Sequence, residues 1–274
     1  MQKVIIITGA SSGIGYDTAE KLAKQGHIVY AAARRTGLME PLKEHGVRIL
    51  EMDVTKEETM QSCIDTVISE HGRIDVLVNN AGYGYFGAVE TVSMDEARRQ
   101  IEVNVFGLAR LTQLVLPIMR AQHSGRIVNV ASVAGRLCLA YGAWYHVSKY
   151  AVEAYSDALR IEAKPFGIDV VLIEPGGIRT DWGIIAADNL IESSKGTAYE
   201  ASASKEASLM YWAYRSKFLS GPSAVTKSIC KAVNRRRPHC RYNPGRGASM
   251  LLFWHAVLPA RVWDAMNRMA VGMK

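Results

Sequence analysis

Residues 4–15 read Val-Ile-Ile-Ile-Thr-Gly-Ala-Ser-Ser-Gly-Ile-Gly, and this stretch decides the fold. Its first four residues are a β-branched run of the kind that a buried parallel strand requires. A T-G-x-x-x-G-x-G turn follows, and apolar residues recur at helical spacing over residues 16–24. The order of strand, glycine turn and helix predicts the first half of a dinucleotide-binding unit. Gly9 would permit the tight turn, Gly13 would let backbone approach a pyrophosphate, and Gly15 would let the helix pack closely on the strand.

The same alternation of short apolar runs and amphipathic segments continues along the chain. Expected strands cover 27–33, 47–52, 74–78, 125–130, 168–173 and 239–242, and expected helices cover 39–45, 56–71, 95–120 with a slight bend at Pro117, 144–163, 223–236 and 249–270. Alternating elements predict a seven-stranded parallel sheet with helices on both faces, a doubly wound Rossmann-type α/β fold. We expect one domain over residues 1–274. Within it, residues 181–221 would be a segment that covers the substrate, and residues 248–271 a single C-terminal helix.

The composition is that of an ordinary globular protein, because 49% of the 274 residues are hydrophobic and 22% are charged. The four cysteines are scattered and have no ligand-like grouping with histidine. They predict reduced thiols in a cytoplasmic protein, with neither disulfides nor a metal site. The first expected strand begins near the N-terminus, so we expect no signal peptide. We also expect no membrane span, since no run of about 18 apolar residues is evident.

The net charge of +7 is unevenly distributed. Residues 221–274 hold ten lysines and arginines and one acid, Asp264, so this tail carries +9 and the preceding residues carry −2. A nucleic-acid-binding protein would be expected to have a basic stripe in its main domain, and none is evident here. The positive charge of the tail therefore calls for a different explanation.

The residues after the second expected strand indicate which dinucleotide would bind. An acidic side chain usually stands at this place and holds a ribose 2′-hydroxyl. This chain has Ala33, followed by Arg34 and Arg35. No carboxylate would repel a 2′-phosphate, and a guanidinium can pair with one, so the sequence predicts NADP(H) rather than NAD(H). Asp53 and Val54 follow the third strand and would meet the adenine edge.

Candidate catalytic residues follow the later strands. Ser132 lies just beyond the fifth expected strand, and Tyr145 and Lys149 stand one helical turn apart on one face of the next helix. A free tyrosine has a pKa near 10, which makes it a poor acid–base group at neutral pH. A nearby ammonium group and an oxidised nicotinamide ring would favour the phenolate. Tyr145 could then exchange a proton with a carbonyl or alcohol oxygen held by Ser132, while the neighbouring His146 is expected to be a packed or solvated residue.

Taken together, these motifs resemble the short-chain dehydrogenase/reductase family over residues 3 to about 181. The resemblance implies a catalytic tetrad of Asn104, Ser132, Tyr145 and Lys149, in which Asn104 kinks its helix and holds a water. It implies that the cofactor is lined by Thr8, Gly9, Ser11, Ser12, Gly13, Ile14, Gly15, Arg34, Asp53, Val54, Asn80, Ala81, Gly82, Tyr145, Lys149, Pro175, Gly176, Ile178 and Thr180. It also implies a homodimer or homotetramer assembled through the helices at 95–120 and 144–163.

The substrate segment at 181–221 is rich in aromatic and aliphatic residues. This content predicts a bulky apolar ketone or secondary alcohol as substrate. The tail loosely resembles the 17β-hydroxysteroid-dehydrogenase-like branch, which would imply a steroid-like substrate. Two alternatives remain: a 3-oxoacyl-thioester reductase that receives an acidic acyl carrier, and an NADP(H)-sensing protein without turnover. The last helix would cover the substrate entrance, meet another subunit or lie on an acidic membrane surface.

Overall fold

The computed structural model describes residues 1–273, and a seven-stranded parallel sheet is its centre. The strand order is β3-β2-β1-β4-β5-β6-β7, and the seven-stranded parallel sheet agrees with the predicted doubly wound fold. The strands are β1 (Val4–Thr8), β2 (Ile28–Ala33), β3 (Arg48–Glu51), β4 (Val76–Asn79), β5 (Gly125–Val130), β6 (Ile168–Ile173) and β7 (Arg241–Tyr242). Because β1 and β4 are neighbours, the connection reverses direction there, and ligands in such sheets bind at the carboxyl ends beside this point.

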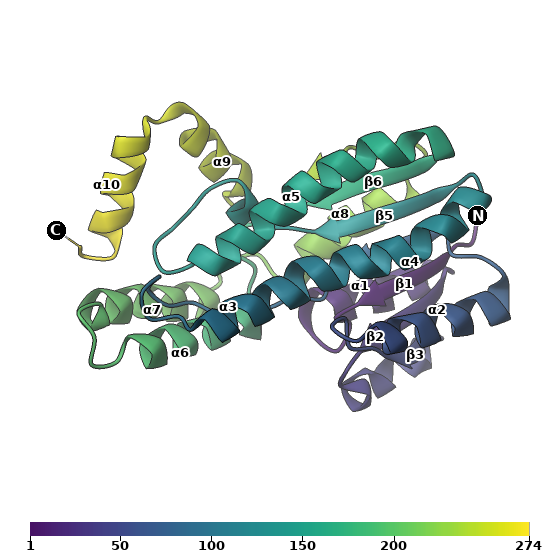
Figure 1. Cartoon of the computed structure of the whole chain (residues 1–274), viewed down its shortest axis with the longest axis horizontal. Coiled ribbons are helices and arrows are strands. Elements are labelled where there is room, and N and C mark those ends of the chain that lie inside the picture. Colours follow the sequence, from purple (N-terminus) through teal and green to yellow (C-terminus); the bar gives the residue numbers. More distant parts are fainter. Residues whose placement is uncertain (274) are drawn as a thin grey trace.

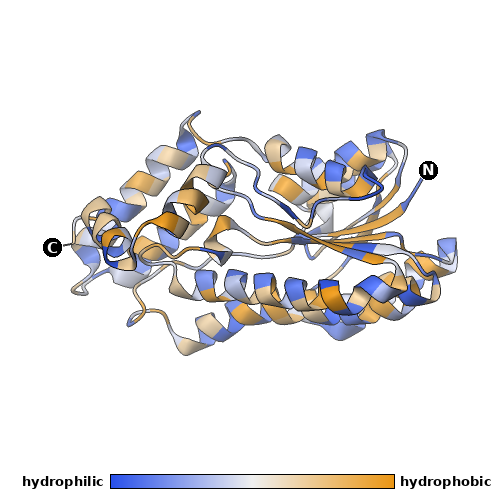
Figure 2. Cartoon of the chain, turned by 90° about the horizontal axis from the view of Figure 1, so that it is seen from above, coloured by the Kyte–Doolittle hydropathy of each residue, from blue (hydrophilic) through white to orange (hydrophobic). Residues whose placement is uncertain are grey.

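Helices cover both faces of the sheet (Figure 1). They are α1 (Gly13–Lys24), α2 (Glu57–His71), α3 (Met94–Ile101), α4 (Gly107–Ala121), α5 (Ala143–Ala163), α6 (Asp181–Ser194), α7 (Glu200–Arg215), α8 (Pro222–Asn234), α9 (Ala248–Val257) and α10 (Ala260–Ala270). The expected helix at 39–45 is a 3₁₀ helix over Thr36–His45. Figure 2 shows the apolar strands between two layers of helices.

Side-chain alternation along β1 divides the core into two layers. Ile5 and Ile7 pack toward α1 and α8, whereas Val4 and Ile6 pack toward α2, α4 and α5. All of β1 is buried, which explains why the strand is apolar at every position rather than at alternate ones. The two apolar layers hold the glycine turn that follows β1 against the sheet edge.

Arg126 at the start of β5 fastens α8 to the sheet. Its Nη1 donates hydrogen bonds to the carbonyl oxygens of Ala232, Val233 and Arg235, at 2.6, 2.8 and 2.8 Å. Its Nη2 donates to Asp169 Oδ2 on β6 at 2.8 Å. The guanidinium therefore satisfies carbonyl groups at the C-terminal end of α8, where no further helical turn can do so.

Two expected helices are each divided in the structure. The segment expected at 95–120 consists of α3 and α4 joined by a π-helical turn at Glu102–Phe106, so the irregularity is at Asn104 rather than at Pro117. The expected helix at 249–270 is wrong as a single element: it is α9 and α10, since Pro259 has no N–H to continue the first helix and Leu258 before it is extended.

Contrary to expectation, the segment Met94–Ala121 is long and apolar enough by length and composition to cross a membrane. Its apolar residues have a different explanation in this fold. Leu111, Val115 and Met119 are fully buried against the sheet, in the layer that also contains α2 and α5. The segment is thus part of the core of an α/β domain.

Candidate active site

The turn after β1 is tied to the end of β4. The Thr8 hydroxyl oxygen accepts hydrogen bonds from the backbone N–H groups of Asn80 and Ala81, both at 3.0 Å. The Asn80 side-chain amide in turn donates to the carbonyl oxygens of Thr8 and Gly9, at 3.0 and 3.2 Å. The two predicted motifs are therefore one structure, in which side chains satisfy the backbone groups that lie beyond the strand ends.

Two glycines are required by this close approach. Gly9 has a φ of +65°, and a Cβ there would lie 2.7 Å from the Ala81 Cα. A Cβ on Gly15 would lie 2.5 Å from the Gly9 carbonyl oxygen. Gly13, at a φ of +56°, lies beside the Thr180 side chain, with 3.5 Å between an added Cβ and Thr180 Cγ2. The turn thus presents bare backbone at the start of α1, which is the chemistry that a pyrophosphate requires.

Cationic side chains stand beside this turn. The Arg35 guanidinium donates a hydrogen bond to Ser11 Oγ at 3.3 Å, and Arg34 is exposed next to it. Burial acts to raise the pKa of Asp53, but hydrogen bonds from Thr55 and the charges of Arg34 and Lys56 outweigh it, so the pKa lies below its usual value. Arg34 is therefore near Asp53, on the side of the turn where a ribose would lie in a dinucleotide fold.

Asn104 is fully buried at the π-helical turn and holds the segment after β4. Its Nδ2 donates to the Tyr83 carbonyl oxygen at 2.8 Å and to Ser148 Oγ at 3.0 Å, and its Oδ1 accepts from the Tyr83 N–H at 3.0 Å. Gly82 lies between Asn104 and Lys149, and an added Cβ would be 3.0 Å from Asn104 Oδ1 and 3.9 Å from Lys149 Nζ. The π-helical turn thus aims a polar side chain at the predicted site.

The other three members of the predicted tetrad gather around the end of β5. Lys149 is buried and its Nζ donates to the Val130 carbonyl oxygen at 2.9 Å, while lying 5.8 Å from the centre of the Tyr145 ring. Ser132 Oγ accepts from the Ala134 N–H at 3.1 Å and donates to the Pro175 carbonyl oxygen at 3.3 Å. The Tyr145 phenol lies near enough to Ser132 for the serine hydroxyl to influence its pKa.

Burial shifts the pKa values of both Tyr145 and Lys149. Burial raises the pKa of Tyr145 to about 12, and the hydrogen bond with Ser132 acts more weakly in the opposite direction. Burial also lowers the pKa of Lys149 to about 8, against the effect of the Glu153 carboxylate. The side chains of this chain therefore keep the phenol protonated at neutral pH, which suits proton donation to a carbonyl oxygen.

Aromatic side chains from two segments cover Tyr145. The Trp182 ring at the start of α6 lies 4.9 Å from the Tyr145 ring, and Phe86 lies 5.9 Å from it, centre to centre. Trp182 also fills the space beside Gly84, where an added Cβ would lie 2.3 Å from its ring. The segment after β6 thus places an apolar wall over the predicted acid, as the substrate-covering hypothesis requires.

His146 has a structural contact pattern, in agreement with its expected packed role. Its Nδ1 is 2.9 Å from the Ala134 carbonyl oxygen, and its Nε2 accepts from the Leu139 N–H at 3.0 Å. The ring spans the loop between Ser132 and Tyr145 and fixes its shape. Cys138 lies in this loop, and burial raises the pKa of its thiol, which makes it a weak nucleophile.

An ion cluster behind Lys149 was missed by sequence reasoning. Arg241 on β7 binds Glu153 and Asp157 of α5 at 3.2 and 2.6 Å, and the buried Glu174 after β6 at 2.9 Å. Burial and the charge of Glu174 raise the pKa of Glu153 to about 7, against the effect of Arg241. Glu153 stands four residues after Lys149, so helical spacing could have identified it as a neighbour of that lysine. Arg241 and Glu174 come from β7 and from the end of β6, and no spacing could have placed them beside it.

The comparisons agree with this geometry. The family model described as short chain dehydrogenase matches residues 3–188. The 3-ketodihydrosphingosine reductase of Bacteroides thetaiotaomicron is 38% identical over 244 residues, covering 89% of this chain and 88% of its own. Among solved structures, a short-chain dehydrogenase from Streptomyces avermitilis is 32% identical, with a TM-score of 0.81 and coverage of 99% and 98%. Actinorhodin polyketide ketoreductase, solved with NADPH, is 28% identical, with a TM-score of 0.74 and coverage of 88% and 95%. This chain belongs to the short-chain dehydrogenase family and is an oxidoreductase.

Proposed function

We propose that this oxidoreductase interconverts a ketone and a secondary alcohol on a bulky apolar substrate, with NADP(H) as cofactor. The observation that carries the proposal is the position of Tyr145, held between Ser132 and Lys149 and covered by Trp182. This arrangement puts a protonated phenol in an apolar enclosure, where a carbonyl oxygen could accept its proton.

The bare glycine turn and the adjacent arginines fit a phosphorylated dinucleotide. Backbone of residues 9–15 would hold the pyrophosphate, and Arg34 would pair with a 2′-phosphate. NADPH would supply the hydride at the substrate carbon. The polyketide ketoreductase that was solved with NADPH supports the choice of cofactor by its likeness to this chain.

The chain's own residues would then handle the proton and the substrate oxygen. Ser132 would hold the oxygen by a hydrogen bond, and Tyr145 would donate the phenolic proton to it. The ammonium group of Lys149 would stabilise the phenolate that remains, since an opposite charge favours the ionised form. Asn104 would keep the segment after β4 in place through two hydrogen bonds to the Tyr83 backbone, and its third bond, to Ser148, ties that segment to α5.

The substrate class rests on the apolar wall. Phe86 and Trp182 flank Tyr145, and Tyr141, Ala186 and Leu190 belong to the same apolar cluster. The relative named 3-ketodihydrosphingosine reductase supports a ketone carried on a lipid chain over a polar one. A steroid-like ketone and a 3-oxoacyl thioester remain the alternative substrates.

The test is a panel of long-chain ketones, steroids and 3-oxoacyl thioesters with NADPH, followed by loss of cofactor absorbance. Tyr145→Phe should lower kcat by about 10²- to 10⁴-fold and leave the Kd for NADPH within a few-fold, because it removes the proton donor and keeps the ring. Tight NADPH binding without turnover on the whole panel would favour the sensing alternative. An unchanged rate in Tyr145→Phe would refute the mechanism.

We also propose a cytoplasmic homodimer or homotetramer that associates through α4 and α5. Phe106, Val147 and Ile161 expose 58%, 49% and 77% of their surface along these helices and the π-helical turn. A cavity of about 340 Å³ beside Phe106 and Trp144 lies on the same face. Multi-angle light scattering gives the oligomeric state, and Ile161→Arg should shift it toward monomer; a monomeric wild type would contradict this.

A further inference from the structure

The last two helices, α9 and α10, form a hairpin (Figure 1). It lies at the same end of the molecule as α6 and α7, the helices of the expected substrate-covering segment. The hairpin is anchored from its inner side. Ala248 and Trp263 are buried with Val133 and Leu137 of the loop before α5, and Leu251, Leu252 and Leu258 pack against this cluster. The Trp263 indole N–H donates to the Cys138 carbonyl oxygen at 3.1 Å. The hairpin is therefore a folded part of the domain.

The outer side of α9 is apolar, and no element within residues 1–273 covers it. Met250, Phe253, Trp254 and Val257 expose 64%, 58%, 48% and 53% of their surface. Their spacing of i, i+3, i+4 and i+7 places them on one face of the helix. Because the inner residues are also apolar, α9 is hydrophobic on two sides, which packing inside this chain alone does not explain.

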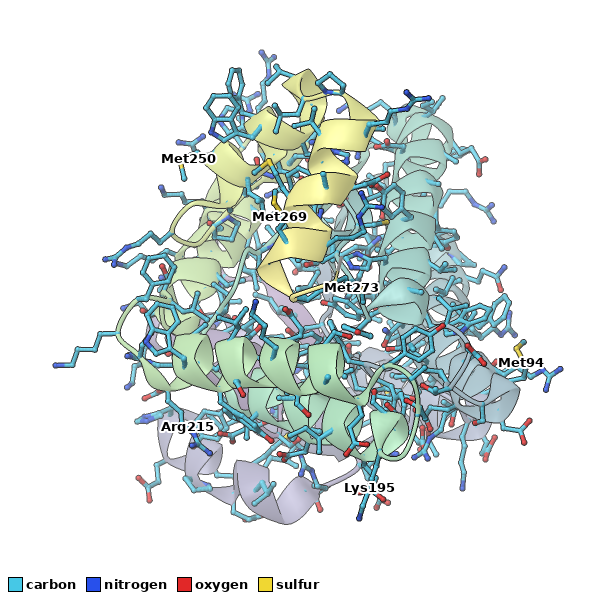
Figure 3. The ribbon with its side chains drawn as sticks, turned by 90° about the vertical axis from the view of Figure 1, so that its left-hand side faces the viewer. Met94, Lys195, Arg215, Met250, Met269 and Met273 are labelled. Atoms are coloured by element: carbon cyan, nitrogen blue, oxygen red, sulfur yellow. The ribbon has the colours of Figure 1, made fainter. Side chains whose placement is uncertain are left out.

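The second helix of the hairpin repeats the pattern. Val262, Met266 and Met269 of α10 are 43%, 48% and 66% exposed, again at i, i+4 and i+7. Figure 3 labels Met250 on α9 and Met269 on α10, both at the surface of this end of the molecule. Seven large apolar side chains are thus presented to the outside by 21 helical residues, an amount of exposed apolar surface that marks an interaction site.

Positive charge accompanies this apolar surface. Arg246 precedes α9, and Arg261 and Arg268 share a separate face of α10 with Asp264; all three arginines are exposed. Over residues 246–273, Asp264 is the one acidic residue against these three arginines, which gives this part of the chain a net charge of +2. A second copy of the chain would bring the same excess of positive charge to this surface, which opposes self-association here. The charge instead favours an anionic partner.

We propose that the outer faces of α9 and α10, defined by these seven apolar side chains, dock on an anionic lipid bilayer. Helices of 10 and 11 residues are about 15 Å long, half the thickness of a hydrocarbon core, so they would lie in the interface and not span it. Aromatic and aliphatic side chains would enter the headgroup boundary, and the arginines would pair with lipid phosphates. An acidic protein partner would match the charge but leaves the two-helix apolar surface less well explained.

The test is flotation of the full-length protein with vesicles of phosphatidylcholine alone or with about 30% phosphatidylglycerol. We expect wild type to partition at least tenfold more strongly to the anionic vesicles. Phe253→Ser with Trp254→Ser should lower that partitioning by at least tenfold, because two inserting aromatic groups are lost. Arg261→Gln with Arg268→Gln should lower it by about fivefold for each arginine, and only on anionic vesicles.

Matched controls exist on other parts of the surface. Trp212 and Phe218 are an exposed aromatic pair outside the hairpin, 62% and 54% exposed, and Trp212→Ser with Phe218→Ser should leave partitioning unchanged. Arg73→Gln with Arg98→Gln is the corresponding charge control. As a direct readout, brominated lipid should quench part of the tryptophan fluorescence, and Trp254→Phe should remove that part.

Several results would overturn the proposal. Absence of binding to anionic vesicles would do so, as would equal losses in the hairpin and control variants. A self-association that Phe253→Ser with Trp254→Ser abolishes, without vesicle binding, would assign the surface to a second copy. Capture of an acidic acyl carrier protein that needs Arg261 and Arg268, again without vesicle binding, would assign it to a protein. None of these measurements depends on turnover, so they can fail separately from the proposed function.

Discussion

Replacement of Glu153 by glutamine is expected to move the alkaline limit of activity to lower pH. Glu153 is a buried neighbour of Lys149 on α5, one helical turn away, and its carboxylate supports the ammonium group. Because burial lowers the pKa of Lys149 to about 8, the ammonium form is lost as the pH rises through that value. The pKa of Glu153 is about 7, so its charge is present over the range in which Lys149 titrates.

The size of the change follows from the distance between the two charges. Unit charges about 6 Å apart, one helical turn, interact by about 3 kcal/mol at an effective dielectric constant of about 20. Arg241 binds Glu153 at 3.2 Å and cancels part of that field at Lys149. If about half of the interaction energy between Glu153 and Lys149 remains, its loss should lower the pKa of Lys149 by about one unit, since about 1.36 kcal/mol corresponds to one pKa unit. The alkaline limb of the pH profile should move down by the same amount.

The variant should remain folded, because Arg241 keeps its contacts with Asp157 and Glu174. The assay is kcat/KM from about pH 6 to about pH 10 with the best substrate of the panel. An NMR titration of the lysine Nζ groups reports the same midpoint without a substrate. Asp157→Asn is the matched control, because Asp157 binds the same arginine but lies at the surface, two turns from Lys149. If wild type and Glu153→Gln had the same alkaline limb and the same Lys149 titration midpoint, Glu153 would not support the Lys149 ammonium group and the reasoning would be refuted.

Three further perturbations test separate parts of the structure. Arg34→Asp should reverse the cofactor preference toward NADH by at least tenfold in Kd, measured by fluorescence titration, since a carboxylate repels a 2′-phosphate; an unchanged ratio would contradict the assignment. Arg126→Met should destabilise the fold by about 3 kcal/mol in urea unfolding, because it leaves carbonyl groups at the C-terminal end of α8 without their donor, and a loss below about 1 kcal/mol would show that water replaces it. Gly84→Ala should raise KM for the substrate with little change in NADPH affinity, as its Cβ would displace the Trp182 ring; equal effects on both would place the wall elsewhere.

Local pattern was sufficient for the sheet and for most of the site. Buried parallel strands need continuous apolar runs, and β1 is one such run, so the strand could be recognised from its residues, while the glycine turn after it located the carboxyl edge. Tyr145 and Lys149 could be placed together because their contact depends on one helical turn. Asn104 was identified only by resemblance, since a single asparagine in a helix carries no signal of its own.

Features that depend on distant segments were not predictable. The cluster of Arg241 with Glu153 and Glu174 joins an edge strand of two residues to α5 and to the end of β6, and no spacing in the sequence relates them. The irregularity of the helix at Asn104 was implied by the resemblance alone, and its hydrogen bonds to Tyr83 could not be derived from the residues. Pro259, by contrast, could have predicted the break in the last helix, because proline lacks the N–H that a helix interior needs. The expected single helix at 249–270 did not take this into account.

The hydrogen bond from the Trp263 indole to the Cys138 carbonyl has a consequence for experiments on the tail. That carbonyl belongs to the loop that carries Ser132 at one end and Tyr145 at the other. A shortened protein that ends before α9 would remove the indole and uncover Leu137, so the loop would lose both its donor and its apolar cover. Activity lost on truncation would therefore reflect a disturbed catalytic loop. Single-residue changes on the outer side of the hairpin test membrane docking while they leave that loop and its contacts in place.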